Sequence, residues 1–291
     1  MKTAESAAHA KHGTGPPLTI EVAEVDENCA ISRWTAADLD HLARIIAIVA
    51  MGQSAHAARI ISELLPAKPA FDHEALRKDA QRRLSVIGKT AQQQDASRHQ
   101  RDGLIFEAIS WAAAQQATNG KALLRDPHIS STTQGLDGLM IEFDETGSQI
   151  ARTTIFEDKC SEHPRRKFRD EILPAFKAYH ANKRAAELME AAAALLQRSG
   201  LDGTEATMAA AKVLDMNYRG YRGSLAVTTE HDSPGRRKGL FKNYDELSDI
   251  EAAQRIGAVF VTSDSLRSWF DELASRAVAF LDTLGPGSAD V

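Results

Sequence analysis

Apolar and polar residues alternate in two short segments near the middle of the chain, residues 135–141 and 153–159. This period of two is typical of β-strands, because successive side chains of a strand point to opposite faces. Between the two segments, Asp144-Glu-Thr-Gly147 has the polar and glycine residues that hairpin loops favour. The pattern therefore predicts two antiparallel strands joined by a hairpin.

Most of the remaining chain has apolar residues spaced three or four apart, which is the helical pattern. Thr35 is expected to cap the first helix, and Pro174 is expected to kink or restart the chain between two others. Three further apolar segments predict strands, at residues 18–25, 224–229 and 258–262. Helices are expected over residues 39–51, 55–65, 71–87, 102–116, 164–173, 175–197, 205–214 and 266–281.

The order of these elements predicts the domain organisation. Strands and helices alternate after residue 96, so an α/β domain is expected over residues 96–284. Residues 18–95 are mainly helical in pattern and are expected to form a separate N-terminal module. The two ends, residues 1–17 and 285–291, have no apolar period and are expected to be flexible tails.

Three charged residues lie in the two segments of the predicted hairpin. Glu157 and Lys159 have the same parity, so they project from one face of their strand, and Asp137 can meet them across the ladder. Carboxylates bind hard divalent cations, and a cation beside an amine can polarise a water for hydrolysis of a phosphodiester. A charged strand edge held by a salt bridge is the alternative. Burying three charges beside Ile155 and Phe156 is costly, however, unless a ligand organises them.

This D…ExK pattern, preceded by a helix that carries an acidic residue, resembles the PD-(D/E)XK nuclease superfamily over roughly residues 100–230. The proline of the superfamily name is absent before the aspartate. The resemblance implies a restriction-endonuclease-like fold, which is a mixed β-sheet core flanked by helices. It also implies that Asp137, Glu157 and Glu107 are metal ligands, that Asp158 contributes its backbone carbonyl, and that Lys159 orients or activates the attacking water.

The same resemblance implies a Mg²⁺-dependent nuclease, with Mn²⁺ as a substitute, that hydrolyses DNA; RNA stays open as a substrate. Members of this class frequently act in bacterial restriction or anti-phage defence, many of them beside an ATPase or helicase. Such a partner is therefore expected, and association of the chain with itself is compatible with the class. Two alternatives remain: an inactive subunit that binds nucleic acid or serves as a scaffold, and a helical protein–protein adaptor.

Charge is unevenly distributed along the chain. The formal net charge is −5, which argues against a general nucleic-acid coat, but residues 163–184 contain seven basic and two acidic residues. Lysine and arginine contacts to phosphate supply most of the sequence-independent affinity for nucleic acid. A solvated helix face is the alternative interpretation. The expected nucleic-acid-binding residues are Arg165, Arg166, Lys167 and Arg169, with Gln134 just before the aspartate strand.

Composition excludes several other classes of protein. Apolar residues make up 43% of the 291 residues, which is ordinary for a globular protein. No apolar run is long enough for a membrane helix and no signal pattern begins the chain, so a cytoplasmic location is expected. Cys29 and Cys160 are too few and too far apart for a disulfide framework or a zinc cluster. No glycine-rich phosphate loop is present, which argues against hydrolysis of nucleoside triphosphates.

Several histidines and tyrosines have more than one interpretation. His128 and His231 could assist protonation of a leaving group, but they stand beside Asp and Pro residues and are interpreted as parts of surface turns. Tyr218, Tyr221 and Tyr244 lie near basic residues in the sequence. Stacking of bases on exposed tyrosines would suit a single-stranded substrate, and burial of the same rings is the alternative.

Overall fold

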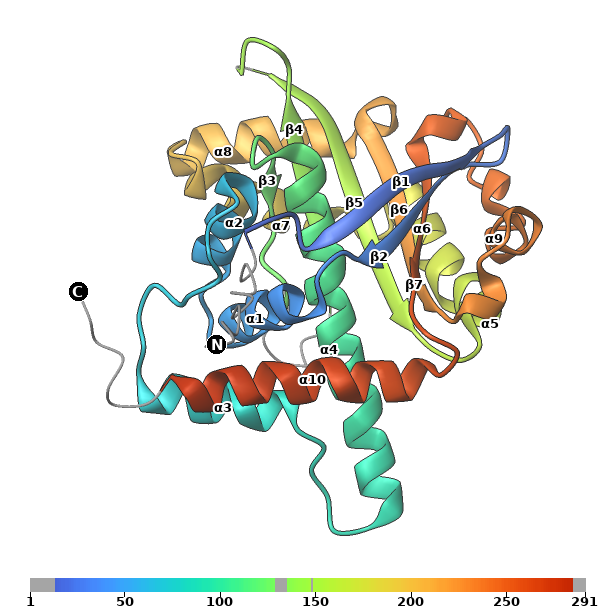
Figure 1. Ribbon diagram of the computed structural model, residues 1–291. Helices are drawn as coiled ribbons and strands as arrows, with labels where there is room; N and C mark the ends of the chain where they lie inside the picture. Colours follow the sequence, from blue (N-terminus) through green and yellow to red (C-terminus); the bar gives the residue numbers. More distant parts are fainter. Residues whose placement is uncertain (1–13, 129–134, 148, 285–291) are drawn as a thin grey trace, which may run out of the picture.

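The structure is a computed structural model that describes residues 14–128, 135–147 and 149–284. Seven strands form one mixed sheet in the order β1-β2-β7-β6-β5-β4-β3 (Figure 1). Strands β2, β7, β6 and β5 are parallel to one another, and antiparallel pairs complete both edges. The strands are β1 Leu18–Val25, β2 Ala30–Ala36, β3 Leu123–Leu124, β4 Gly138–Phe143, β5 Ile150–Cys160, β6 Arg219–Val227 and β7 Arg255–Val261.

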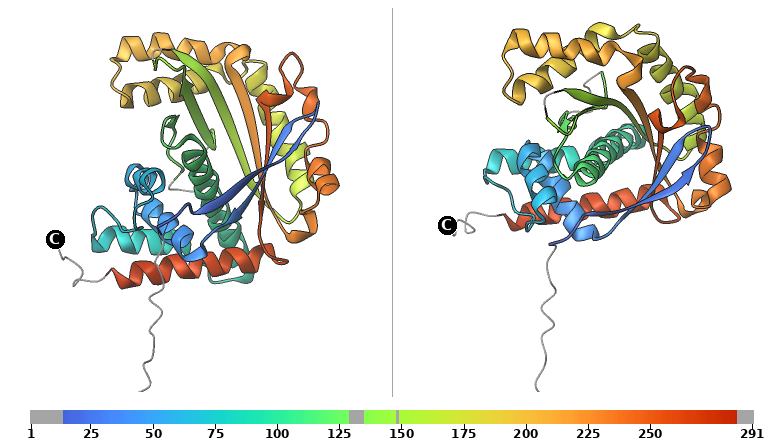
Figure 2. Two further views of the ribbon diagram at one scale, coloured as in Figure 1. Left: turned by 45° about the horizontal axis from the view of Figure 1, so that its top comes forward. Right: turned by 90° about the horizontal axis from the view of Figure 1, so that it is seen from above.

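Helices cover both faces of the sheet (Figure 2), which confirms an α/β fold with a mixed sheet flanked by helices. One apolar core lies between the sheet and the helices of the first face, and a second core lies on the opposite face. The helices of the first face are α1 Leu39–Ala50, α2 Ser54–Glu63, α3 Glu74–Leu84, α4 Ala91–Thr118 and α10 Leu266–Thr283. Those of the second are α5 Pro164–Lys167, α6 Leu173–His180, α7 Ala185–Arg198, α8 Gly203–Ala210 and α9 Pro234–Leu240.

Strand β2 is an element that the sequence pattern did not predict. Thr35 lies within β2 and does not cap a helix, so that prediction is wrong. The cap of α1 is Asp38, whose side chain accepts hydrogen bonds from the backbone N–H groups of Asp40 and His41. Because β2 pairs in parallel with β7, the β1–β2 hairpin is part of the sheet.

The predicted domain boundary between residues 95 and 96 falls inside α4. This helix is continuous over 28 residues and begins at a capping box in which Thr90 and Gln93 satisfy each other's backbone N–H groups. Trp34 of β2 also shares a core with Phe156 of β5 and Phe260 of β7. The sheet and its core are therefore continuous across residues 95 and 96.

The helical stretch predicted over residues 175–197 is two helices, α6 and α7. The chain breaks at Asn182, whose backbone is left-handed with φ 53°, a conformation that asparagine tolerates better than most residues. The irregularity predicted at Pro174 is present as a single π-helical turn, Phe168–Ile172, directly before it. Proline has no N–H to donate, so the regular hydrogen-bond pattern cannot run through it.

Helix α4 begins at Ala91, well before the predicted start at residue 102, and the remaining predicted elements agree with the structure to within a few residues. β6 and β7 begin earlier than expected, and the described residues 14–17 lead directly into β1. The expected tails otherwise lie outside the described residues. None of the helices in the described ranges is both long enough and apolar enough to cross a membrane. Cys29 and Cys160 are free thiols, in agreement with the absence of a disulfide framework.

Candidate functional site

The β4–β5 hairpin brings together the three charged residues that the sequence singles out. The two strands are antiparallel, as predicted, and Gly138 faces Phe156, so Asp137 lies opposite Glu157. The ammonium group of Lys159 lies 3.2 Å from Oδ2 of Asp137 and 3.3 Å from Oε2 of Glu157. Glu157 is 8% exposed, whereas Asp137 and Lys159 are 22% and 24% exposed. A solvent-borne ligand can therefore reach the last two.

The electrostatics of this cluster favour a protonated lysine. Burial raises the pKa of Glu157, the charge of Asp137 raises it further, and Lys159 opposes both effects. Burial alone would lower the pKa of Lys159, but the two carboxylates outweigh it and raise that pKa. Lys159 is thus a hydrogen-bond donor and a positive charge, not a proton acceptor.

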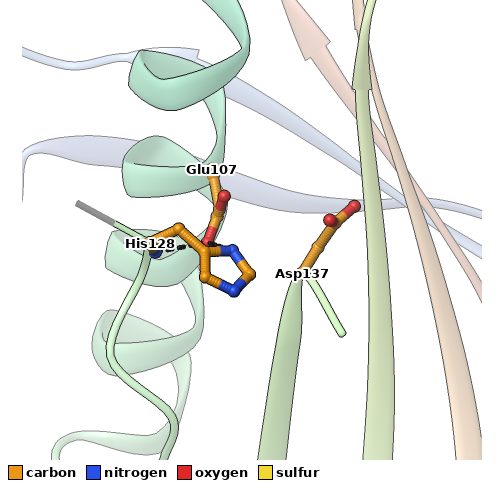
Figure 3. A group of neighbouring side chains, drawn as sticks. All are labelled: Glu107, His128 and Asp137. Atoms are coloured by element: carbon orange, nitrogen blue, oxygen red, sulfur yellow. Dashed lines mark hydrogen bonds and ion pairs between the residues drawn. The ribbon is translucent and has the colours of Figure 1, made fainter. Parts of the chain in front are cut away.

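A second acidic group approaches the cluster from α4. Glu107 Oε1 accepts a hydrogen bond from the backbone N–H of His128 at 2.6 Å and lies 3.0 Å from Nδ1 of its ring. Ligand atoms of Glu107, His128 and Asp137 all lie within 4.8 Å of one another. Figure 3 shows the side chain of His128 beside Glu107 and facing Asp137 across the space between α4 and β4. The carboxylates of Glu107 and Asp137 therefore lie close together, in the arrangement that the resemblance implies.

His128 is the residue of the site that the sequence did not identify. Its side chain is only 10% exposed, so the surface position expected for it is wrong. Its partner Glu107 comes 21 residues earlier in the chain, on a helix, and no local motif connects the two. The Asp-Pro pair before His128 indicated a turn, but the direction of the imidazole depends on tertiary packing.

Asp158, between Glu157 and Lys159, has its side chain on the other face of β5. Its carboxylate accepts a hydrogen bond from the hydroxyl of Ser110 on α4 at 2.8 Å. Burial raises its pKa to about 7, and the guanidinium of Arg222 opposes that rise. The backbone N–H of Asp158 donates to Oδ2 of Asp137 at 2.8 Å. Asp158 thus attaches β5 to α4 and fixes the orientation of Asp137.

Arg222 reinforces this attachment from β6. Its guanidinium lies 3.5 Å above the ring centroid of Phe156 and donates to the backbone carbonyl of Ser110 at 3.0 Å. It is buried, as is Arg219, so neither guanidinium can contact nucleic acid. Tyr221 and Tyr244 are likewise in the core, which settles their interpretation as buried rings.

The residues expected to contact nucleic acid lie in different environments. Arg165 donates to two backbone carbonyls, one in α9 and one in the loop that follows it. Lys167 pairs with the glutamate four positions on, and Arg169 pairs with the aspartate that follows it. Arg166 is exposed. Gln134 lies outside the described residues.

A Gly138→Ala variant is expected to disturb the site through the strand register. A Cβ at this position would lie 2.6 Å from Cδ2 of Phe156, whose ring also stacks against the guanidinium of Arg222. Such overpacking costs about 1–3 kcal/mol of unfolding free energy. The measurement is urea unfolding, with Gly239→Ala in α9 as the control because a Cβ added there would have no other atom within 4 Å. Equal stability of Gly138→Ala and wild type would contradict this packing.

Comparisons with known proteins identify no relative of the chain: no family model, no curated protein and no solved structure matches it. The geometry of the site is therefore the observation from which function is inferred.

Proposed function

We propose that the chain is a metal-dependent nuclease with a restriction-endonuclease-like fold that hydrolyses DNA phosphodiester bonds. The observation that carries this proposal is the convergence of Asp137, Glu157 and Lys159 at one end of the β4–β5 hairpin. The ammonium nitrogen of Lys159 lies 3.2 Å from a carboxylate oxygen of Asp137 and 3.3 Å from one of Glu157. Glu107, whose carboxylate approaches that of Asp137 from α4, supplies the acidic residue that the superfamily carries on a helix.

The donor set fits a hard divalent cation. Asp137, Glu157 and Glu107 would hold it through carboxylate oxygens, the ligands that Mg²⁺ prefers, and Mn²⁺ accepts the same set. Burial raises the pKa of Glu107 and of Glu157, so the ionised carboxylates are unfavourable by themselves and a cation would stabilise them. When bound, the ion supplies charge neutralisation at the phosphate and lowers the pKa of a coordinated water.

The residues of the chain orient the reacting groups. Protonated Lys159 donates a hydrogen bond to the attacking water or stabilises charge that develops on the phosphate. The backbone N–H of Asp158 holds the carboxylate of Asp137 in place. Asp158 is itself bonded to Ser110, which attaches strand β5 to the helix that carries Glu107.

The biological setting belongs to the same proposal. Resemblance to the superfamily suggests bacterial restriction or anti-phage defence in the cytoplasm, with an ATPase or helicase partner to control the nuclease. A subunit that binds nucleic acid but has lost turnover is the competing function. The two differ in whether the carboxylates take up a metal ion.

Calorimetric titration with Mg²⁺ and Mn²⁺ separates these functions. Wild type is expected to bind either ion, and Glu157→Gln is expected to lose the binding heat because one charged ligand is gone. Glu145→Gln, an exposed glutamate at the tip of the same hairpin, is the control and should bind as wild type does. Absence of metal uptake by the wild type would favour the inactive subunit.

A further inference from the structure

A short loop after β3 connects the two carboxylates that approach the site from α4 and from β4. Within it, the backbone N–H of Arg125 donates to the carbonyl of Leu139 at 2.8 Å. The guanidinium Nη1 of the same residue donates to the carbonyl of Leu136, also at 2.8 Å. Arg125 therefore attaches the loop to the chain on both sides of Asp137.

His128, three residues after Arg125 in this loop, holds Glu107. Both the backbone N–H and the ring Nδ1 of His128 lie against one oxygen of that carboxylate, Oε1, at 2.6 and 3.0 Å. Within the described ranges, no hydrogen bond reaches the second oxygen, Oε2. Burial raises the pKa of Glu107, and the hydrogen bonds from His128 oppose that rise, so they favour the ionised carboxylate.

The tautomer of His128 follows from its second contact. Ring Nε2 lies 3.2 Å from Nη2 of Arg125. A guanidinium only donates hydrogen bonds, so Nε2 must accept, and the ring proton is then on Nδ1, where it is donated to Glu107. Both ring nitrogens therefore have a hydrogen-bond partner. A cation bound at Nε2 would be repelled by the positive charge of Arg125.

We propose that Arg125 and His128 are positioning residues of the metal site. His128 is not a metal ligand, although one of its ring nitrogens lies within 4.8 Å of a carboxylate oxygen of Glu107 and of Asp137. His128 occupies one oxygen of Glu107 and leaves the other for the ion, while Arg125 sets the place of Asp137. One loop thus fixes the spacing between the carboxylates of two elements. This inference rests on the proposed function, since it concerns the same site.

Mn²⁺ is the probe for the test, because its electron spin reports directly on the atoms that bind it. Pulsed electron paramagnetic resonance of Mn²⁺-loaded wild type is expected to show no coupling to a coordinated imidazole nitrogen. Loss of a residue that orients a ligand weakens metal binding by about 10–100-fold, and this loss is expected for His128→Ala in a Mn²⁺ titration.

A His128→Asn variant distinguishes a positioning residue from a ligand. The asparagine amide N–H can replace the Nδ1–H donor but not an imidazole nitrogen bound to the ion, so Mn²⁺ affinity should stay close to that of wild type. His231→Ala, at a half-buried histidine outside the loop, is the control for affinity, and thermal unfolding checks the fold of each variant.

Each outcome decides a separate point. Imidazole coupling in the wild type, or equal loss of affinity in His128→Asn and His128→Ala, would overturn the positioning role and leave the nuclease proposal standing. Failure of the wild type to bind Mn²⁺ would overturn the proposed function, and this inference with it. The wild-type spectrum needs no variant, so it decides even if His128→Ala does not fold.

Discussion

Cleavage of DNA in Mg²⁺ is expected to fall by about 10²–10³-fold when Lys159 is replaced by methionine, which is the range for loss of one hydrogen-bond donor that stabilises developing charge. Methionine keeps most of the apolar stem and removes the ammonium that lies between Asp137 and Glu157. The carboxylates that would hold the ion stay in place. The measurement is the initial rate of plasmid nicking at saturating Mg²⁺.

The matched control is Lys177→Met. Lys177 also pairs with a glutamate, Glu246, but it lies on α6 and is 47% exposed. Its cleavage rate should equal that of wild type. Affinity for DNA, measured in EDTA to prevent turnover, should be nearly unchanged in both variants, because one ammonium is a small part of a phosphate-binding surface. Cleavage at the wild-type rate by Lys159→Met would refute the role of this lysine.

The largest loss of stability is expected at Arg219, whose side chain is fully buried. Its guanidinium donates to the carbonyls of Val213 and Tyr179, at 2.5 and 2.8 Å, and to the side-chain oxygen of Asn182. These bonds join the start of β6 to the break between α6 and α7.

Arg219→Met should lower the free energy of unfolding by about 3 kcal/mol. Each hydrogen bond from a charged donor contributes roughly 1.5–3 kcal/mol, and two buried backbone carbonyls would be left without a donor, while relief from burying the guanidinium offsets part of the loss. Urea unfolding gives the value, with Arg236→Met as control, because Arg236 is 57% exposed and its ion pair with Glu230 contributes about 0–1 kcal/mol. Similar losses in the two variants would contradict the account of Arg219.

The hairpin and its three charged residues could be predicted because they depend on local rules. The alternation of apolar and polar residues determines which side chains share a face of a strand. The polar and glycine residues between the two segments determine where the chain turns. Those rules alone place Glu157 and Lys159 on one face and Asp137 across from them, as the register of β4 and β5 confirms. The α/β class followed in the same way from the order of periodic segments.

Other parts of the site could not be predicted because they depend on contacts between distant segments. Arg125 and His128 are neighbours in sequence, but their role depends on a helix and a strand that pack on either side of them. The burial of Arg219 and Arg222 could not be predicted locally, because only acceptors distant in the sequence make it tolerable. Strand β2 was missed because its place beside β7, more than 200 residues later, is visible only in the fold.

The most direct test of the metal-dependent nuclease is incubation of purified wild type with supercoiled plasmid, linear duplex and single-stranded DNA, in Mg²⁺, in EDTA, and in EDTA followed by excess Mg²⁺. Cleavage of at least one substrate is expected in Mg²⁺, none in EDTA, and recovery when the ion is restored, because the carboxylates of Asp137, Glu157 and Glu107 would act through the bound cation. Intact DNA under every condition, or cleavage that EDTA does not inhibit, would contradict the assignment.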